Sequence, residues 1–118
     1  MVVDDSQSIK KMLEDTLEKA GYIVLSADSG QAALDIINNN NIDLLITDYL
    51  MPEMSGVELT KVVRQLPQYK SIPILLLSTE SSADEKRLAR DAGATGWIVK
   101  PFDPEQLISV VERVTSSQ

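Results

Sequence analysis

The stretch DLLITDYLMPEMSG, residues 43–56, decides the fold of this chain of 118 residues. Its run Leu44–Ile46 is short and apolar, which is typical of a parallel strand buried on both faces. Pro52 and Gly56 then predict a turn, because proline fixes its own backbone and glycine tolerates conformations that other residues avoid. Asp48 is therefore expected at the carboxyl end of a strand, where open parallel sheets bind their ligands. A lone acid in this position can also serve only to cap the next helix, so other residues are needed to assign its role.

Strand and helix patterns alternate five times along the chain, with short connections. The expected strands are Met1–Val3, Tyr22–Leu25, Leu44–Ile46, Pro73–Leu77 and Trp97–Val99. The expected helices begin near Ser6 or Ser8, Ser29, Val57, Ser82 and Asp103, and they end near Gly21, Ile37, Leu66, Ala92 and Val114. Parallel strands joined by right-handed helical crossovers give a doubly wound α/β sheet with helices on both faces. We expect a flavodoxin-like (βα)5 domain whose five-stranded parallel sheet has the strand order 2-1-3-4-5.

The helix expected over Ser82–Ala92 has a thin apolar face. Only its alanines and Leu88 can be buried, against four charged residues in the segment Asp84–Arg87. Ser82 and Glu85 stand at the spacing of a capping box, which would begin the helix. Few buried contacts predict low local stability, so this helix should be held less firmly than its neighbours.

Composition narrows the class of protein. A net charge of -7 argues against nucleic acid as a direct partner, because phosphate binding needs a basic face. The chain has no cysteine, so neither a disulfide framework nor a thiolate site is possible. No segment approaches about 18 consecutive apolar residues, and no export signal is recognisable, so we expect a cytoplasmic protein without a membrane partner. The length is that of one domain, spanning residues 1–118.

Reactive groups gather where the expected strands end. Asp4 and Asp5 follow the first strand, Asp48 the third, Ser78 the fourth and Lys100 the fifth. Because the carboxyl ends of parallel strands meet at one edge of the sheet, these five side chains are expected to lie together. Three carboxylates within a few Å repel each other by about 1 kcal/mol per pair in water, and more where solvent is excluded. A compensating positive charge is therefore required among them.

Lys100 supplies one positive charge, and a metal ion would supply the rest. The remaining groups are oxygen donors, which suit Mg2+, whereas a chain with neither cysteine nor histidine is a poor match for zinc or copper. A metal beside Asp48, with Lys100 opposite and a hydroxyl at Ser78, describes a pocket for a phosphoryl group. In that pocket Asp48 is the nucleophile that forms an acyl phosphate.

The chain resembles the receiver domains of two-component response regulators, and most of all the single-domain members of the chemotaxis type. The likeness covers essentially all 118 residues. The matching stretches are Val2–Ser6, Asp48–Gly56, Ser78 and Gly96–Phe102. By that resemblance, Asp48 is the phosphoacceptor and receives its phosphoryl group from a phosphohistidine of a partner histidine kinase.

The resemblance also implies a role for each residue around Asp48. Asp5 and Asp48 would bind Mg2+ directly, Asp4 would bind it through water, and the backbone carbonyl of Leu50 would add a ligand. Ser78 and Lys100 would contact the phosphoryl oxygens. The Lys100–Pro101 peptide bond, which places Pro101 after the lysine, would be cis.

A conformational switch and a tuned phosphoryl lifetime follow from the same resemblance. Ser78 would move toward the phosphoryl group, and Trp97 would rotate into the space left behind. Trp97 stands where tyrosine or phenylalanine is more usual, and it can equally be an aromatic residue packed only for stability. Leu50 and Glu80 would flank the path of the attacking water, and Glu80 would either orient that water or meet an auxiliary phosphatase.

Rival functions lack their characteristic residues. A phosphatase of the haloacid dehalogenase type needs a second acid two residues after the nucleophile, where this chain has Leu50. A flavodoxin-like cofactor carrier needs a phosphate loop after the first strand, where Asp4 and Asp5 would repel the phosphate. A dinucleotide site needs a G-x-G-x-x-G motif, which the sequence does not contain. A constitutive interaction module remains the alternative from another class.

Output is expected through a surface. The best candidate is the face built from the fourth helix, the fifth strand and the fifth helix, where Lys86, Arg87, Arg90 and Trp97 are available, although an ordinary solvated charged face would look the same. We expect a monomer. The brief first strand suggests that a few upstream residues are missing, and the polar end at residues 114–118 favours a stand-alone regulator. A receiver domain cut from a larger regulator would look identical.

Overall fold

The computed structural model describes residues 1–79 and 82–116. Its strands are β1 (Val2–Val3), β2 (Ser26–Ala27), β3 (Leu45–Asp48), β4 (Ile74–Ser78) and β5 (Gly96–Val99). Its helices are α1 (Gln7–Lys19), α2 (Gly30–Asn39), α3 (Gly56–Gln65), the short 3-10 helix η1 (Pro67–Tyr69), α4 (Ala83–Ala92) and α5 (Pro104–Ser116). All paired strands are parallel, in the order β2-β1-β3-β4-β5, so the predicted fold class and strand order are confirmed.

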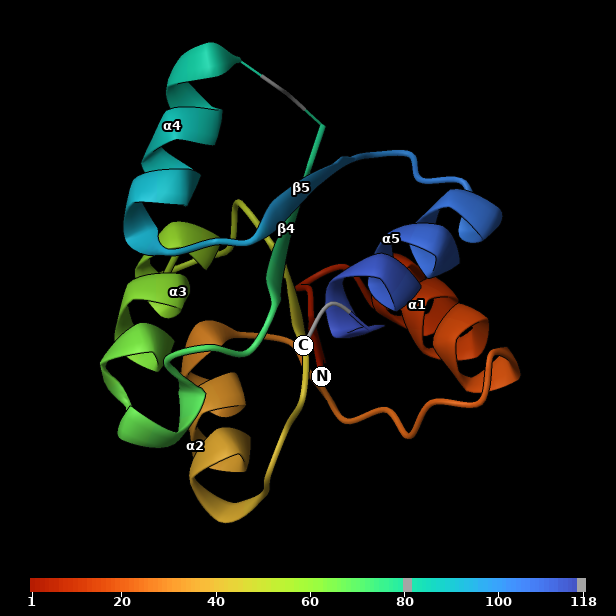
Figure 1. Cartoon of the computed structure of the whole chain (residues 1–118), viewed down its shortest axis with the longest axis horizontal. Coiled ribbons are helices and arrows are strands. Elements are labelled where there is room, and N and C mark those ends of the chain that lie inside the picture. The colour runs from red at the N-terminus through yellow and green to blue at the C-terminus, as the bar shows by residue number, and fades with distance from the viewer. Residues whose placement is uncertain (80–81, 117–118) are drawn as a thin grey trace.

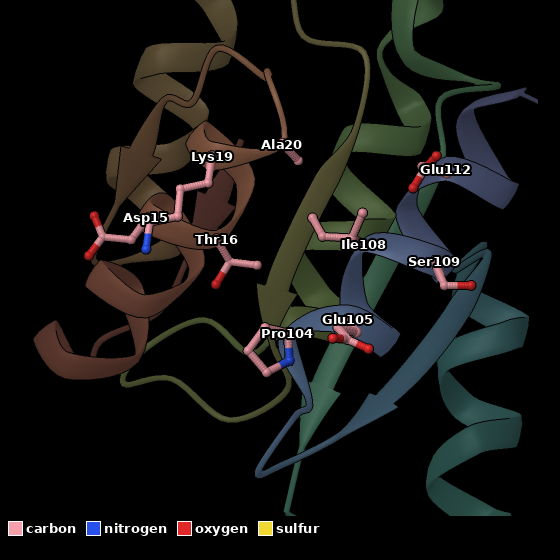
Figure 2. Close-up of a pocket in the computed structure, with 9 residues that line it drawn as sticks. All are labelled: Asp15, Thr16, Lys19, Ala20, Pro104, Glu105, Ile108, Ser109 and Glu112. Atoms are coloured by element: carbon pink, nitrogen blue, oxygen red, sulfur yellow. The ribbon is translucent and has the colours of Figure 1, made fainter.

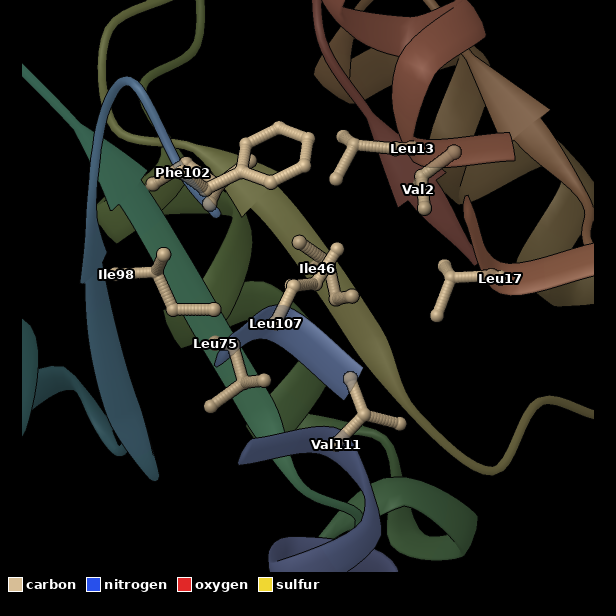
Figure 3. Packing of buried hydrophobic residues seen from close by; sticks show 10 residues of the cluster. Val2, Leu13, Leu17, Ile46, Leu75, Ile98, Phe102, Leu107 and Val111 are labelled. Carbon is tan, nitrogen blue, oxygen red and sulfur yellow. The ribbon is translucent and has the colours of Figure 1, made fainter. Parts of the chain in front are cut away.

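Two layers of helices enclose the sheet. Helices α1 and α5 cover one face, and α2, α3 and α4 lie on the other (Figure 1). The central strands are buried on both faces, and every residue of β3 and β4 is buried. One apolar cluster lies under α1 and α5 (Figure 3); its buried members are Val2, Leu13, Leu17, Ile46, Leu75, Leu77, Ile98, Phe102, Leu107 and Val111. A second cluster joins the sheet to α2, α3 and η1.

The second strand is not where the sequence predicted it. The paired residues are Ser26–Ala27, in register with Val2–Val3, instead of Tyr22–Leu25. The backbone N–H of Tyr22 still donates to Leu17 at the end of α1, and Ile23 is 95% exposed. Most apolar side chains of Tyr22–Leu25 pack against the two core clusters as the chain approaches the sheet, and of these residues Leu25 also accepts a hydrogen bond from the Val2 N–H of β1, at 2.9 Å.

Helix α3 starts directly beyond the loop that follows Asp48. The Ser55 hydroxyl accepts from the Glu58 N–H at 3.1 Å, and the Glu58 carboxylate accepts from the Ser55 N–H at 3.0 Å, which makes a complete capping box. The Gly56 N–H donates to the carbonyl of Tyr49 at 2.9 Å. A Cβ at residue 56 would collide with the carbonyl oxygen of Asp48, so glycine is needed for this close approach. The corner that carries Asp48 is therefore rigid.

At the start of α4, the Ser82 hydroxyl accepts from the Glu85 N–H at 3.2 Å and donates to the Glu85 carboxylate at 2.9 Å. The Ser82 hydroxyl therefore caps the helix, and the Glu85 carboxylate of the predicted capping box accepts from that hydroxyl. Within the described part of the chain, no helix has the length and apolar character that crossing a membrane requires.

Candidate functional site

Four strand ends deliver side chains to one edge of the sheet. Strand β1 runs into Asp4 and Asp5, β3 ends at Asp48, β4 ends at Ser78, and β5 runs into Lys100. The strands are parallel and adjacent, so these residues share the carboxyl edge, as the sequence predicted. Asp48 and Ser78 are the last residues of their strands, Asp4 and Asp5 directly follow β1, and Lys100 directly follows β5, so the strand ends themselves position these residues.

Lys100 lies between two buried carboxylates. Its Nζ is 3.1 Å from Asp4 Oδ2 and 3.0 Å from Asp48 Oδ1. Asp4 is fully buried and Asp48 is 8% exposed, so both charges are withdrawn from bulk water. The other Asp4 oxygen accepts from the backbone N–H of Ser6 at 2.9 Å, where α1 begins. Removing one partner from such a buried pair typically costs about 3–5 kcal/mol, because the other charge is left uncompensated.

The third acid completes an oxygen-donor cluster. One carboxylate oxygen from each of Asp4, Asp5 and Asp48 lies within 4.8 Å of the others. When all are ionised, the three carboxylates and the Lys100 ammonium leave two excess negative charges. A divalent cation would neutralise them, and the oxygen-only donor set fits Mg2+ and not zinc or copper. Asp5 is exposed, so the cluster is open to a ligand from solvent.

Electrostatics at the site favours a charged lysine and a reactive carboxylate. Burial raises the pKa of Asp48 above its ordinary value, and the hydrogen bond from Lys100 only partly opposes this effect. Burial alone would lower the pKa of Lys100, but its hydrogen bonds to Asp48 and Asp4 and the charges of both acids outweigh burial and raise the pKa. Lys100 therefore remains an ammonium group, while the poorly solvated Asp48 carboxylate is more basic than an exposed one.

Ser78 and Trp97 lie on neighbouring strands near this cluster. Ser78 is 4% exposed and pairs in register with Val99, and its carbonyl accepts from the Lys100 N–H at 2.8 Å. Trp97 is half-buried on β5. The Lys100–Pro101 peptide bond is cis, the isomer that the resemblance implied. The hydroxyl, the lysine and the aromatic residue are thus carried by two adjacent strands.

Of the two residues predicted to tune the phosphoryl lifetime, the structure describes Leu50. Leu50 lies two residues beyond Asp48, and it is 67% exposed. Its side chain therefore faces solvent at the mouth of the site. Glu80 lies outside the described residues.

Tyr49 contacts Trp97, and no role for Tyr49 was predicted from the sequence. Its ring centroid lies 5.3 Å from that of Trp97, with the two planes tilted by 58°. Burial and the nearby charge of Glu85 raise the pKa of its hydroxyl. The alternation of side chains along the strands would have predicted this contact. Thr47 pairs with Leu76 and Leu76 pairs with Trp97, so these side chains lie on the same face of the sheet. Tyr49 lies two residues beyond Thr47 and therefore on that face too. The residue after Asp48 therefore links the carboxylate cluster to β5.

Three of the four residues named for the predicted output surface lie together. Lys86, Arg90 and Trp97 line a hollow of about 170 Å³ between α4 and β5. Arg87 instead pairs with Asp84 on the exposed side of α4, at 3.2 Å. A separate, larger groove of about 650 Å³ lies between α1 and α5 (Figure 2). None of the carboxylates of the cluster lines that groove, so it is distinct from the site described above.

Comparison with known proteins agrees with this geometry. Residues 1–112 match the family model of the response regulator receiver domain. The chemotaxis protein CheY1 of Helicobacter pylori is 40% identical over 116 residues, which cover 97% of this chain and 94% of that protein. The two-component response regulator ORR3 of Oryza sativa subsp. indica is 35% identical over 115 residues, covering 97% of this chain and 88% of that protein.

A solved structure is also similar. The crystallised chemotaxis protein CheY4 of Vibrio cholerae superposes with a TM-score of 0.94 at 47% identity, covering 96% of this chain and 94% of that one. The family match and the relatives extend over nearly the whole chain, and the acidic pocket of Asp4, Asp5 and Asp48 is typical of receiver sites that bind Mg2+. The chain belongs to the response regulator receiver domain family.

Proposed function

We propose that residues 1–118 form one receiver domain in which Asp48 accepts a phosphoryl group from a phosphohistidine of a histidine kinase. The observation that carries this proposal is the Lys100 ammonium held between Asp4 and Asp48, with Asp5 alongside. A purely structural ion pair needs one carboxylate for one lysine. Three carboxylates around one ammonium at the ligand-binding edge of a sheet leave a net negative charge that a bound cation would relieve.

The chemistry is a phosphoryl transfer between two protein side chains. An Asp48 oxygen forms a bond to phosphorus while the bond between phosphorus and the imidazole nitrogen breaks, and the electron pair stays on that nitrogen. Lys100 and the Ser78 hydroxyl are assigned to the phosphoryl oxygens, where an ammonium and a hydroxyl donor would offset the added negative charge. The burial of Asp48 supports this role, because a poorly solvated carboxylate is a stronger nucleophile.

Mg2+ is assigned to the carboxylate cluster, held directly by Asp5, Asp48 and the carbonyl of Leu50 and through water by Asp4. When bound, it would neutralise charge on the transferring group. The engagement of both Asp4 oxygens by Ser6 and Lys100 supports the water-mediated role of Asp4, because little of that carboxylate remains for direct coordination.

Phosphorylation adds about -1.5 to -2 charge, which suffices to reposition a hydroxyl and its loop. We assign the switch to Ser78 and Trp97, and the output surface to α4, β5 and α5. The named relatives CheY1 and CheY4 favour chemotaxis as the process. We assign the output to a monomer that acts on a partner protein. Leu50 and Glu80 are assigned to tuning the phosphoryl lifetime, alone or with a phosphatase.

The test is labelling by acetyl phosphate or phosphoramidate. Wild-type protein should gain one phosphoryl group when Mg2+ is present and none when Mg2+ is chelated before the phosphodonor is added. Asp48→Asn should abolish labelling, because the amide is not a nucleophile. Asp43→Asn is the matched control, since Asp43 lies exposed just before β3, beyond its opposite end, and should label like wild type. The fluorescence of Trp97, the only tryptophan, reports whether labelling also reaches β5.

Two outcomes would contradict the proposal. Labelling that persists in Asp48→Asn would move the phosphoacceptor to another residue. A folded wild-type protein that never labels would favour the constitutive interaction module instead.

A further inference from the structure

Arg64 joins the ends of three segments on the face of the sheet that carries α4. It lies in the last turn of α3, and its Nε donates to the carbonyl of Gly93 at 2.9 Å. Its Nη1 donates to the carbonyl of Tyr69 in η1 at 3.0 Å, and its Nη2 contacts the Thr95 hydroxyl at 3.5 Å, just before β5. One guanidinium thus holds the end of α4, the start of β5 and η1 together.

The contact with Gly93 is close as well as polar. Gly93 ends α4 with a φ of 107°, a conformation that favours glycine. A Cβ there would lie 2.9 Å from Arg64 Cγ and 3.1 Å from Nε, so the arginine stem packs directly on the helix end. The N–H groups of Gly93 and Ala94 close the last turn on Arg90 and Ala89, each at 3.0 Å. The positive guanidinium therefore meets the negative end of the helix dipole of α4.

The opposite end of α3 is fixed to the corner that carries Asp48. The Gly56 N–H donates to the carbonyl of Tyr49, and the Ser55–Glu58 capping box sets the helix start. Helix α3 consequently connects the loop that follows Asp48 to the C-terminal end of α4. Its length is set by a regular helix, so the two ends cannot move independently without breaking one set of hydrogen bonds.

Helix α4 is anchored mainly at that same end. Its buried residues are Ala89 and Ala92, both in its second half. The first half, Ala83–Leu88, is largely exposed. The contacts that hold α4 in place are therefore concentrated around Gly93 and diminish toward Ser82.

We infer that Arg64 is a positioning residue that clamps the C-terminal end of α4, so that any rearrangement of this helix pivots about Gly93. The part of the inference that concerns rearrangement rests on the proposed phosphorylation of Asp48. The part that concerns the clamp does not, because it predicts the behaviour of the unmodified protein.

Amide hydrogen exchange resolved by residue tests the clamp. Arg64→Met keeps the aliphatic stem but removes the charge and all three donor contacts. Exchange at Gly93, Ala94 and the last turn of α4 should accelerate at least tenfold, while the amides of α5 stay unchanged. Arg87→Met is the matched control, because it removes the same charge from an exposed residue that, in the described ranges 1–79 and 82–116, pairs with Asp84 on the same helix, and it should leave α4 as in wild type. If Arg64→Met does not fold, Arg64→Lys, which keeps the charge and loses the fork, provides the same comparison.

Unchanged exchange at Gly93 and Ala94 would overturn the clamp, and so would an equal rise in α4 and α5, which reports only a loss of global stability. Beryllium fluoride with Mg2+ then tests the pivot. In wild type, exchange should change in the first half of α4 and stay protected at Gly93; in Arg64→Met the change should reach Ala94. A change centred on Gly93 in wild type would overturn the pivot. A wild-type protein that does not respond counts against the proposed function, and the clamp is then decided by the unliganded comparison alone.

Discussion

Helices α4 and α5 lie on opposite faces of the same sheet, but they are attached to it in different ways (Figure 1). Helix α5 contributes the fully buried Leu107 and Val111 to the apolar cluster under α1 and α5, and Ile108, Val110 and Val114 pack against that cluster. Among the described residues, neither core cluster includes a residue of α4. The two buried residues of α4 are alanines, which leave little apolar area to remove from water.

This difference separates the roles of the two helices. Burying a leucine or valine fully is worth about 1.5–3 kcal/mol, so α5 is held by apolar area that any displacement would expose. Helix α4 is held at one end by the hydrogen bond from Arg64 to Gly93, and one such bond with a charged donor contributes about 1.5–3 kcal/mol, which is less than the two fully buried side chains of α5 together. Displacing the first half of α4 exposes little apolar surface. The helix beside the Tyr49–Trp97 pair is therefore the element that a phosphoryl group can move at low cost.

The largest loss of stability is expected from a substitution in the buried face of α5. Leu107→Ala removes a fully buried side chain from a cluster to which four strands and two helices contribute. The free energy of unfolding should fall by about 2–5 kcal/mol, because the lost transfer energy adds to that of the cavity left behind. Urea unfolding followed by circular dichroism measures this loss. A loss below about 1 kcal/mol would mean that α5 is not held as the packing indicates.

A smaller effect should come from the anchored end of α4. Gly93→Ala puts a side chain into a left-handed conformation and against the stem of Arg64, and it should cost at least about 1–2 kcal/mol. Gly21→Ala is the matched control, because Gly21 has a φ of 97° with nothing within 4 Å of an added Cβ. The difference between the two variants in urea unfolding isolates the contact with Arg64. Equal losses would show that only backbone strain matters and that the arginine yields without cost.

Much of this arrangement could be predicted from the sequence, since it depends on local patterns. The apolar stretches 44–46 and 73–77 each lead within two residues to a reactive side chain, and the parallel topology then brings Asp4, Asp5, Asp48 and Lys100 together. The thin apolar face of α4 could also be predicted, because it depends on the residues of one helix alone. The ion pairs of Lys100 confirm that its charge lies among the acids, as the repulsion argument required.

What the sequence could not predict depends on contacts between distant segments. The start of β2 was placed four residues too early, because apolar residues near an edge strand do not show which of them pair with β1. Arg64 was not singled out from the sequence, where it stands as one basic residue near the end of a helix. Its partners Gly93 and Thr95 are about 30 positions away and offer backbone or hydroxyl oxygens, which no side-chain pattern reveals.

The smallest effect is expected from the free face of α4. Leu88 is 52% exposed, so Leu88→Ala should change the free energy of unfolding by less than about 0.5 kcal/mol. Ile108→Ala is its counterpart on α5: that side chain is half-buried against the core cluster, so the cost should be clearly larger. The same urea titrations measure both variants. If Leu88→Ala cost as much as Ile108→Ala, the first half of α4 would have to be packed in solution, and the comparison between a helix held by its core and a helix held by one end would fail.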